Sequence, residues 1–164
     1  AIARGANILA EIVGFAMNSD ASDIVVPSQQ GAATSMTRAL QDARMDLSDV
    51  GYINAHGTGT RANDTTECAA ITKVFGTHVE KLMVSSTKSM HGHLIGGTGA
   101  VELLACIMAI RDGIIAPTIG YEQKDTSCDI DVVPNIARNA KVKGVVSNAF
   151  AFGGMNAVLV MRPV

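Results

Sequence analysis

Short apolar runs alternate with longer stretches of helical periodicity along this chain. Residues that favour strands are concentrated in five runs, 8–17, 50–56, 82–87, 142–150 and 156–162. Small and apolar residues recur at helical spacing over 31–45, in a stretch that ends near Phe75, and over 96–111. Several strand runs are apolar throughout, which is typical of strands buried on both faces of a sheet. The pattern predicts an α/β fold with αβα layers and a mixed, mostly parallel five-stranded sheet, with one antiparallel strand at the end of the chain.

Two helices carry further signals in their residues. Asn63 and Asp64 offer an N-cap for the helix that ends near Phe75, which would place Glu67 in the first turn as a helix-stabilising acid. The helix 96–111 is apolar on more than one face, so we expect it to be deeply buried. The stretch KSMHGH after the third strand run is expected to be a polar loop.

The composition is apolar, with 48% hydrophobic and 17% charged residues and a mean hydropathy of +0.26. So little charge favours a well-buried sheet, a surface hidden against a partner, or both. The net charge is −2 and lysine and arginine are scattered, which argues against a nucleic-acid partner. The apolar stretches are far shorter than the ~20 residues that a membrane span needs.

The three cysteines, Cys68, Cys106 and Cys128, are odd in number and widely spaced. This pattern argues against a disulfide framework or a zinc site, so we expect no metal and a reducing, cytoplasmic location. Cys68 and Cys106 are predicted to be core residues, and Cys128 to lie unreactive in a polar loop. The chain opens on Ala1 and reads as a stretch from the middle of a longer sequence, so we expect one domain, 1–164, of a larger protein.

Three polar or glycine-rich turns follow three of the predicted strands. They are the segments 56–60 (HGTGT), 88–93 (KSMHGH) and 148–154 (NAFAFGG). Functional groups of α/β sheets collect beyond the carboxyl ends of the strands, where such turns meet. A single histidine at a strand end is usually structural, but two histidine-bearing turns at equivalent strand ends favour a shared site. The glycines beside them would let the backbone approach a ligand closely.

These motifs resemble a known enzyme family. NAHGTGT with Asp64 and Glu67 downstream, VSSTKSMHGHLIGGTGAVE, and SNAFAFGGMN look like the three motifs of the carboxy-terminal domain of β-ketoacyl-[acyl carrier protein] synthases. The resemblance covers essentially the whole chain and preserves motif order and spacing. It implies a thiolase-like half, closest to the elongating synthases of fatty-acid synthesis. Nodulation-type synthases and polyketide ketosynthases share the same motifs.

The resemblance implies a decarboxylative Claisen condensation of malonyl-carrier protein with an acyl thioester. The substrates would be carried on phosphopantetheine, with no further cofactor. The implied partners are the acyl carrier protein, an amino-terminal domain that carries the cysteine nucleophile, and a second copy in a homodimer. No cysteine here has the surroundings of that nucleophile, so the chain alone is expected to be inactive. The alternative is a noncatalytic domain of the same fold that binds a carrier protein or a ketosynthase; a thiolase is a weaker third possibility.

The resemblance assigns catalytic roles to four residues. His56 and His93 match the two family histidines, which donate hydrogen bonds to the malonyl thioester oxygen as negative charge develops there. Each must present an N–H while uncharged, and burial disfavours the charged form. Lys88 would disfavour imidazolium further, and Glu102 is expected to pair with Lys88. An ordinary ion pair that secures a loop is the competing explanation for these two.

The resemblance also implies a substrate-binding set, which comprises Thr58, Thr60, Phe150, Phe152, Gly153 and Asn156. The two threonines would contact the pantetheine arm, although threonines in tight turns often bond only to the backbone. Phe152 would screen the acyl pocket and add its backbone N–H to an oxyanion hole, whereas Phe150 is also explained as core. The chain departs from the family pattern at His91, Ala149, Ala151 and Met155. His91 is interpreted as a loop residue, and the other three as influences on loop mobility and substrate length.

Overall fold

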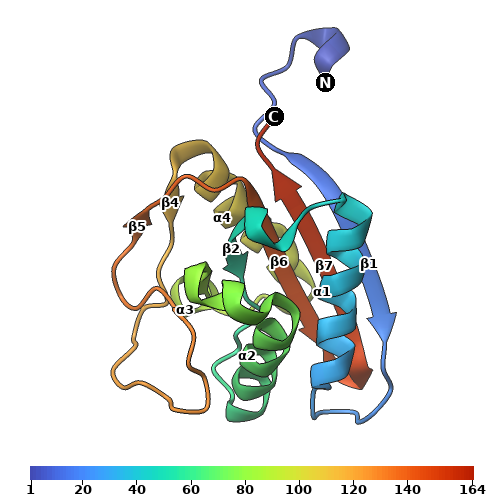
Figure 1. Ribbon diagram of the computed structural model, residues 1–164, viewed down its shortest axis with the longest axis vertical. Coiled ribbons are helices and arrows are strands. Elements are labelled where there is room, and N and C mark those ends of the chain that lie inside the picture. Colours follow the sequence, from blue (N-terminus) through green and yellow to red (C-terminus); the bar gives the residue numbers. More distant parts are fainter.

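A mixed five-stranded sheet forms the centre of the computed structural model, which describes residues 1–164 (Figure 1). Its strands are β1 (Glu11–Ser19), β2 (Val50–Asn54), β3 (Met83–Ser85), β6 (Gly144–Ala151) and β7 (Met155–Arg162), in the spatial order β1-β7-β6-β2-β3. β2 pairs in parallel with β3 and β6, while β7 is antiparallel to both β6 and β1. The predicted mixed αβα architecture is therefore confirmed. The antiparallel strand lies inside the sheet, between β6 and β1.

Helices cover both faces of the sheet. α1 (Gln29–Ala43) and α2 (Arg61–Phe75) lie together on one face, and α4 (Thr98–Asp112) lies on the other (Figure 1). Short 3₁₀ turns join several elements, and β4 (Ile114–Ile115) and β5 (Arg138–Asn139) form a small second sheet. No helix is both long and apolar enough to cross a membrane.

The layer between α1 and the sheet is unusually thin at one point. A Cβ added to Gly14 of β1 would lie 2.3 Å from the backbone oxygen of Ala39 in α1. Only glycine allows this close approach of α1 to β1, where small residues of α1 such as Ala39 and Ala43 face the strand. The opposite core layer is built around Tyr52, whose buried hydroxyl lies 2.9 Å from Ser85 Oγ.

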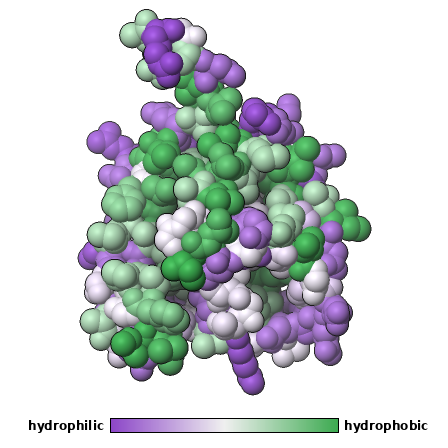
Figure 2. All heavy atoms as spheres, turned by 180° about the vertical axis from the view of Figure 1, so that it is seen from behind, coloured by the Kyte–Doolittle hydropathy of each residue, from purple (hydrophilic) through white to green (hydrophobic).

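The helix predicted over 96–111, which the structure shows as α4, is not deeply buried, contrary to the prediction. Leu104 is 60% exposed and Met108 is 50% exposed on α4. Phe15 and Met17 of β1 are also exposed, and their alternation with buried Ala16 places them on the α4 side of the sheet. Figure 2 shows this side, where apolar side chains gather into a broad area. The apolar pattern of α4 was read correctly, but no other part of this chain covers the apolar surface that α4 and β1 present.

Two predicted local structures also need correction. Thr60 is the N-cap of α2 and accepts a hydrogen bond from the Asn63 N–H at 3.3 Å, so the helix begins earlier than Asn63 and Asp64 suggested. Glu67 consequently lies in the second turn, fully buried, and not in the first turn. The expected polar loop after β3 begins with one helical turn, α3 (Lys88–His91).

The expectation that the cysteines form no disulfide is wrong, although Cys68 is buried as predicted. Cys68 of α2 and Cys128 of the 116–137 segment form a disulfide across 60 residues of sequence. Wide spacing along the chain did not exclude it, because the fold lays this segment against α2 and brings the two Cα atoms to 5.5 Å. Cys106 is a free, fully buried core residue, as predicted.

Candidate active site

The turns after β2 and β3 bring two histidines together. The ring centroids of His56 and His93 are 5.6 Å apart, and the rings meet edge to face with an interplanar angle of 83°. Phe150, near the end of β6, lies 5.7 Å from the His56 ring and is buried in the core layer under α1. Three separate strand ends thus contribute to one location, which parallel strands make possible.

The backbone of the first histidine turn is anchored by Glu67. Its two carboxylate oxygens accept the N–H groups of His56 at 2.9 Å and Gly57 at 2.8 Å, and Asn148 Nδ2 donates to it at 3.0 Å. Burial raises the pKa of Glu67, while these donors oppose the rise. The residue therefore links α2 and β6 to the turn and fixes where the His56 ring can point.

Sequence reasoning missed this role because it treated Glu67 as an acid of the helix terminus. A signal was present in the spacing. Asn63, Glu67, Ala70 and Ile71 recur at helical intervals on one face of α2, and all four are buried. A carboxyl group on the buried stripe of a helix needs internal donors, and unpaired N–H groups of a glycine-rich turn are suitable ones.

The buried ammonium group of Lys88 contacts the backbone of His56. Lys88 Nζ is 2.5 Å from Glu102 Oε1 and 2.5 Å from the backbone oxygen of His56. The expected pairing of Lys88 with Glu102 is therefore present. Burial raises the pKa of Glu102, and the ammonium group of Lys88 opposes the rise. Glu102 Oε2 has no hydrogen-bond partner, nor do the side-chain oxygens of Asn54 and Asn148, so acceptors exceed donors in this cluster.

The surroundings of His56 keep its imidazole uncharged. Burial, with the positive charge of Lys88 and the neighbouring His93 acting in the same direction, lowers the pKa of His56 to about 3. At neutral pH the ring is therefore a neutral donor and acceptor. His93, in contrast, is exposed in this chain.

Two groups of the following segment determine the tautomer of neutral His93. Its Nδ1 accepts the backbone N–H of Ile95 at 3.2 Å and lies 2.8 Å from Thr98 Oγ1. A backbone N–H can only donate, so Nδ1 must be the unprotonated nitrogen. The proton of the neutral ring is then on Nε2, which leaves that N–H free to donate to a ligand.

The third turn joins β6 to β7 and projects an aromatic ring. Phe152 is 73% exposed, and both Gly153 and Gly154 have φ of 76°. The Gly153 N–H donates to the backbone oxygen of Ile24 at 2.9 Å, which joins this turn to the loop after β1. The amide of buried Asn156 is turned toward the same loop, 2.9 Å from Asp20 Oδ2. The structure thus gives Asn156 a bracing contact and leaves Phe152 open.

Comparison with known proteins decides the family. Residues 9–122 match the family described as "Beta-ketoacyl synthase, C-terminal domain". The chain belongs to the β-ketoacyl synthases. It is 51% identical over its full length to Nodulation protein E of Rhizobium sp. (strain N33), covering 41% of that protein. It is 49% identical to 3-oxoacyl-[acyl-carrier-protein] synthase 2 of Coxiella burnetii, where 98% of the chain covers 39% of the relative.

Solved structures agree with this assignment. A type II polyketide ketosynthase in complex with its acyl-carrier protein superposes with a TM-score of 0.95 and 35% identity, over 99% of this chain and 40% of the ketosynthase chain. The fold is therefore the thiolase-like carboxy-terminal half of a ketosynthase. This ketosynthase domain spans about two fifths of the length of the curated relatives that it matches.

The remaining motif residues of the ketosynthase domain have mainly local contacts. Thr58 Oγ1 lies 3.0 Å from Thr60 Oγ1, and Thr60 caps α2, so the structure shows a capping role for the second threonine. The ring of His91 spans Thr87 Oγ1 at 3.1 Å and the Gly92 oxygen at 2.8 Å. His91 therefore stabilises its own helical turn.

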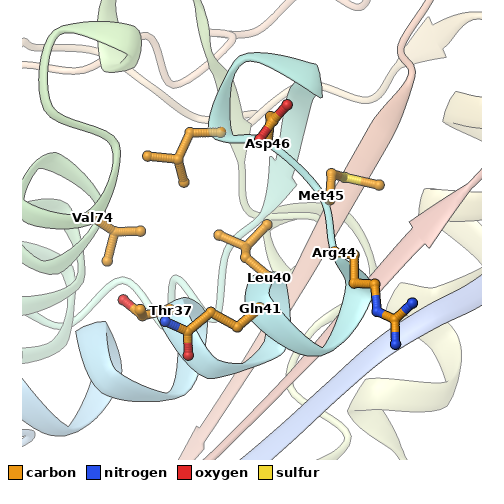
Figure 3. Close-up of a pocket in the computed structure, with 8 residues that line it drawn as sticks. Thr37, Leu40, Gln41, Arg44, Met45, Asp46 and Val74 are labelled. Carbon is orange, nitrogen blue, oxygen red and sulfur yellow. The ribbon is translucent and has the colours of Figure 1, made fainter.

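Two surface pockets lie away from the histidines. A pocket of about 360 Å³ lies at the carboxyl end of α1 (Figure 3). Val74, at the end of α2 remote from the His56 turn, lines it together with Leu40 and Asp46. Neither pocket includes His56, which is buried, or His93, which is exposed. No thiol is available to the histidine pair, because Cys106 is buried with its pKa raised by burial to about 12, and the other two cysteines are bonded to each other.

Proposed function

We propose that this chain is the carboxy-terminal half of a 3-oxoacyl-[acyl carrier protein] synthase that acts in fatty-acid or polyketide-like synthesis. The observation that carries the proposal is the edge-to-face pair of His56 and His93, 5.6 Å apart. One ring is held uncharged by burial and Lys88, and the other presents Nε2–H. Two neutral donors at one point are suited to an oxygen that gains negative charge.

The chemistry follows from that arrangement. An acyl group is held as a thioester on a cysteine of the amino-terminal half. Malonyl-carrier protein loses carbon dioxide, and the electrons of the broken C–C bond form an enolate whose oxygen accepts hydrogen bonds from His56 and His93. The enolate carbon then attacks the acyl thioester, and the cysteine leaves as thiolate. Each donor contributes about 3–4 kcal/mol in comparable oxyanion sites.

Protonation of His56 would work against this reaction. An imidazolium ion at the same point would stabilise the carboxylate of the malonyl group before the reaction as well as the enolate, which reduces the differential gain. Lys88 opposes that protonation from below the ring. The ion pair with Glu102 keeps the lysine in place, so the structural and electrostatic explanations of Lys88 hold together.

The proposal includes partners, because the chain spans only about two fifths of the length of its relatives. The open apolar side of α4 and β1, with Leu104, Met108 and Phe15 exposed, fits contact with the amino-terminal half (Figure 2). Phosphopantetheine of an acyl carrier protein would deliver the substrates past Thr58 and the exposed Phe152. A homodimer and a cytoplasmic location belong to the same proposal and rest on the family membership; the Cys68–Cys128 disulfide is not typical of a reducing compartment.

The test uses the intact protein and malonyl-carrier protein. We expect His93→Ala to lower the decarboxylation rate by about 10²–10³-fold, since one donor to the enolate is lost. Labelling of the nucleophilic cysteine by an acyl-like reagent should continue unchanged. His91→Ala is the matched control, because His91 contacts only its own turn, and it should retain decarboxylation. Undiminished decarboxylation in His93→Ala would refute the proposed role and favour the noncatalytic binding domain.

A further inference from the structure

Cys68 and Cys128 have no part in the chemistry proposed for the histidines. Cys68 belongs to α2, and Cys128 lies in the segment 116–137, which connects β4 to β5. Their sulfurs are bonded although 60 residues separate them in sequence. We propose that this pair is a redox-active site, opened by thiol–disulfide exchange with a dithiol and closed again by a small disulfide.

The disulfide is the main attachment of the outer part of its segment. Residues 122–129 are exposed except for half-buried Cys128. Much of their hydrogen bonding is internal; the Asp125 carboxylate accepts both the N–H and the O–H of Ser127. The side-chain hydrogen bond from this stretch to α2 is the 3.4 Å contact between Ser127 and Thr65. Opening the S–S bond therefore removes the covalent link between residues 122–129 and α2 and leaves the Ser127–Thr65 contact and the packing of Ile130.

The two sulfurs differ in accessibility, which gives the exchange a direction. Cys68 is only 8% exposed, whereas Cys128 lies on the outer, half-buried side. A thiolate of the dithiol attacks Cys128 Sγ, forming a mixed disulfide and releasing the Cys68 sulfur. The second thiol of the dithiol then attacks the mixed disulfide and releases Cys128. Two electrons and two protons pass to the pair, and the dithiol becomes a disulfide. Oxidation by glutathione disulfide reverses the balance.

The tethered segment lies next to both histidine turns. Cys68 directly follows Glu67, which anchors the first turn. Near the start of the segment, Thr118 Oγ1 accepts the N–H of Ser86, two residues before the second turn. The segment is held near the 88–93 turn by Thr118 and near the 56–60 turn by the disulfide. Reduction should therefore loosen it beside the 56–60 turn.

The first experiment maps the bond in the intact protein. The protein is purified without reductant, its free thiols are blocked in denaturant with N-ethylmaleimide, and tryptic peptides are analysed by mass spectrometry. We expect peptide 62–73 linked to peptide 125–138, with the Cys106 peptide alkylated. Dithiothreitol added under native conditions should abolish the link, and glutathione disulfide should restore it. Peptides that are never linked, or that stay linked after native reduction, would overturn the proposal.

The second experiment measures the tether itself. Trypsin cleavage after the exposed Lys124 is followed in the native protein with and without dithiothreitol. Reduction should raise the rate about tenfold, because cleavage follows the population of the open segment. Cys128→Ser should show the higher rate under both conditions, whereas the matched Cys106→Ala should behave as wild type. A wild-type rate indifferent to reduction would refute the tether. Neither readout requires condensing activity, so the result is independent of the function proposed above.

Discussion

The charge of Lys88 should add to burial in determining how acidic the solution must be before His56 gains a proton. In the folded protein the pKa of His56 falls from 6.5 to about 3, with burial as the largest cause and Lys88 the next. The difference is on the order of 5 kcal/mol between the two protonation states. At pH 5 only about 1% of His56 would be charged, against about 97% of an unperturbed imidazole.

Lys88→Met removes the positive charge and retains most of the side-chain volume. Without that like charge the pKa of His56 should rise, yet stay below 6.5, because burial remains. Glu102 loses its partner in the same variant, and its burial then favours the neutral acid. Lys143→Met is the matched control, since the Lys143 side chain is 82% exposed and pairs with Asp49 away from the site. The control should leave the titration of His56 unchanged.

The assay is an NMR titration of ¹³C-labelled histidine side chains in the intact protein from about pH 7 down to about pH 2, so that a midpoint near 3 lies inside the range. The His56 resonance is assigned by its disappearance in His56→Gln. Because folding depresses this pKa, the unfolded chain binds more protons between pH 6.5 and about 3, so the stability contribution present above pH 6.5 is lost through that window. Denaturant stability should therefore fall more steeply on acidification in wild type than in His56→Gln. A wild-type midpoint above pH 5, or identical midpoints in wild type and Lys88→Met, would refute the electrostatic reasoning.

Three further substitutions test the framework of the site. Glu67→Ala removes the acceptor of the buried His56 N–H and of the half-buried Gly57 N–H, and should lower the free energy of unfolding by about 2–4 kcal/mol in urea titrations, with a smaller loss in Glu67→Gln. Gly14→Ala would bring a Cβ to 2.3 Å from the Ala39 backbone oxygen, so the Tm should fall by at least about 3 °C in calorimetry; an unchanged Tm would contradict the close approach. Thr98→Val removes the hydroxyl beside Nδ1 of His93 and should slow decarboxylation about tenfold while binding of the carrier protein persists; equal rates would argue against that contact as a positioning one.

The layered fold was predictable because its signals are local. The apolar run of β2 and the helical spacing of α1 each lie within a short stretch of consecutive residues. Such stretches were enough to predict the type and order of the elements. The end of α2 nearest the site was less certain, since Thr60, Asn63 and Asp64 are all acceptable caps. The backbone conformation of the glycine turn decided among them. The exposure of α4 was missed because an apolar pattern shows that a surface needs a cover, without showing which chain supplies it.

The site was predictable in its composition and less so in its connections. Motif resemblance drew attention to His56, His93 and Lys88, and the structure brings the first two within 5.6 Å. The anchoring of the His56 turn by Glu67 and the bond between Cys68 and Cys128 depend on how distant segments fold back. The helical spacing of Glu67 shows only that its carboxyl group is buried, and nothing in the sequence shows which donors it meets or that the two cysteines come together.

The turn between β6 and β7 is confined by its own ladder. Ala151 pairs with Met155, and the antiparallel register continues without interruption to Val145 and Met161. Val158 and Val160 face the core under α1, while Met161 belongs to the opposite layer. Adding or deleting a single residue in this turn would slip β7 by one place and exchange its two faces. Natural variation here should therefore hold loop length constant and keep glycine at 153 and 154, whose φ is 76°, so homologues would differ in the other residues of the turn at a fixed geometry.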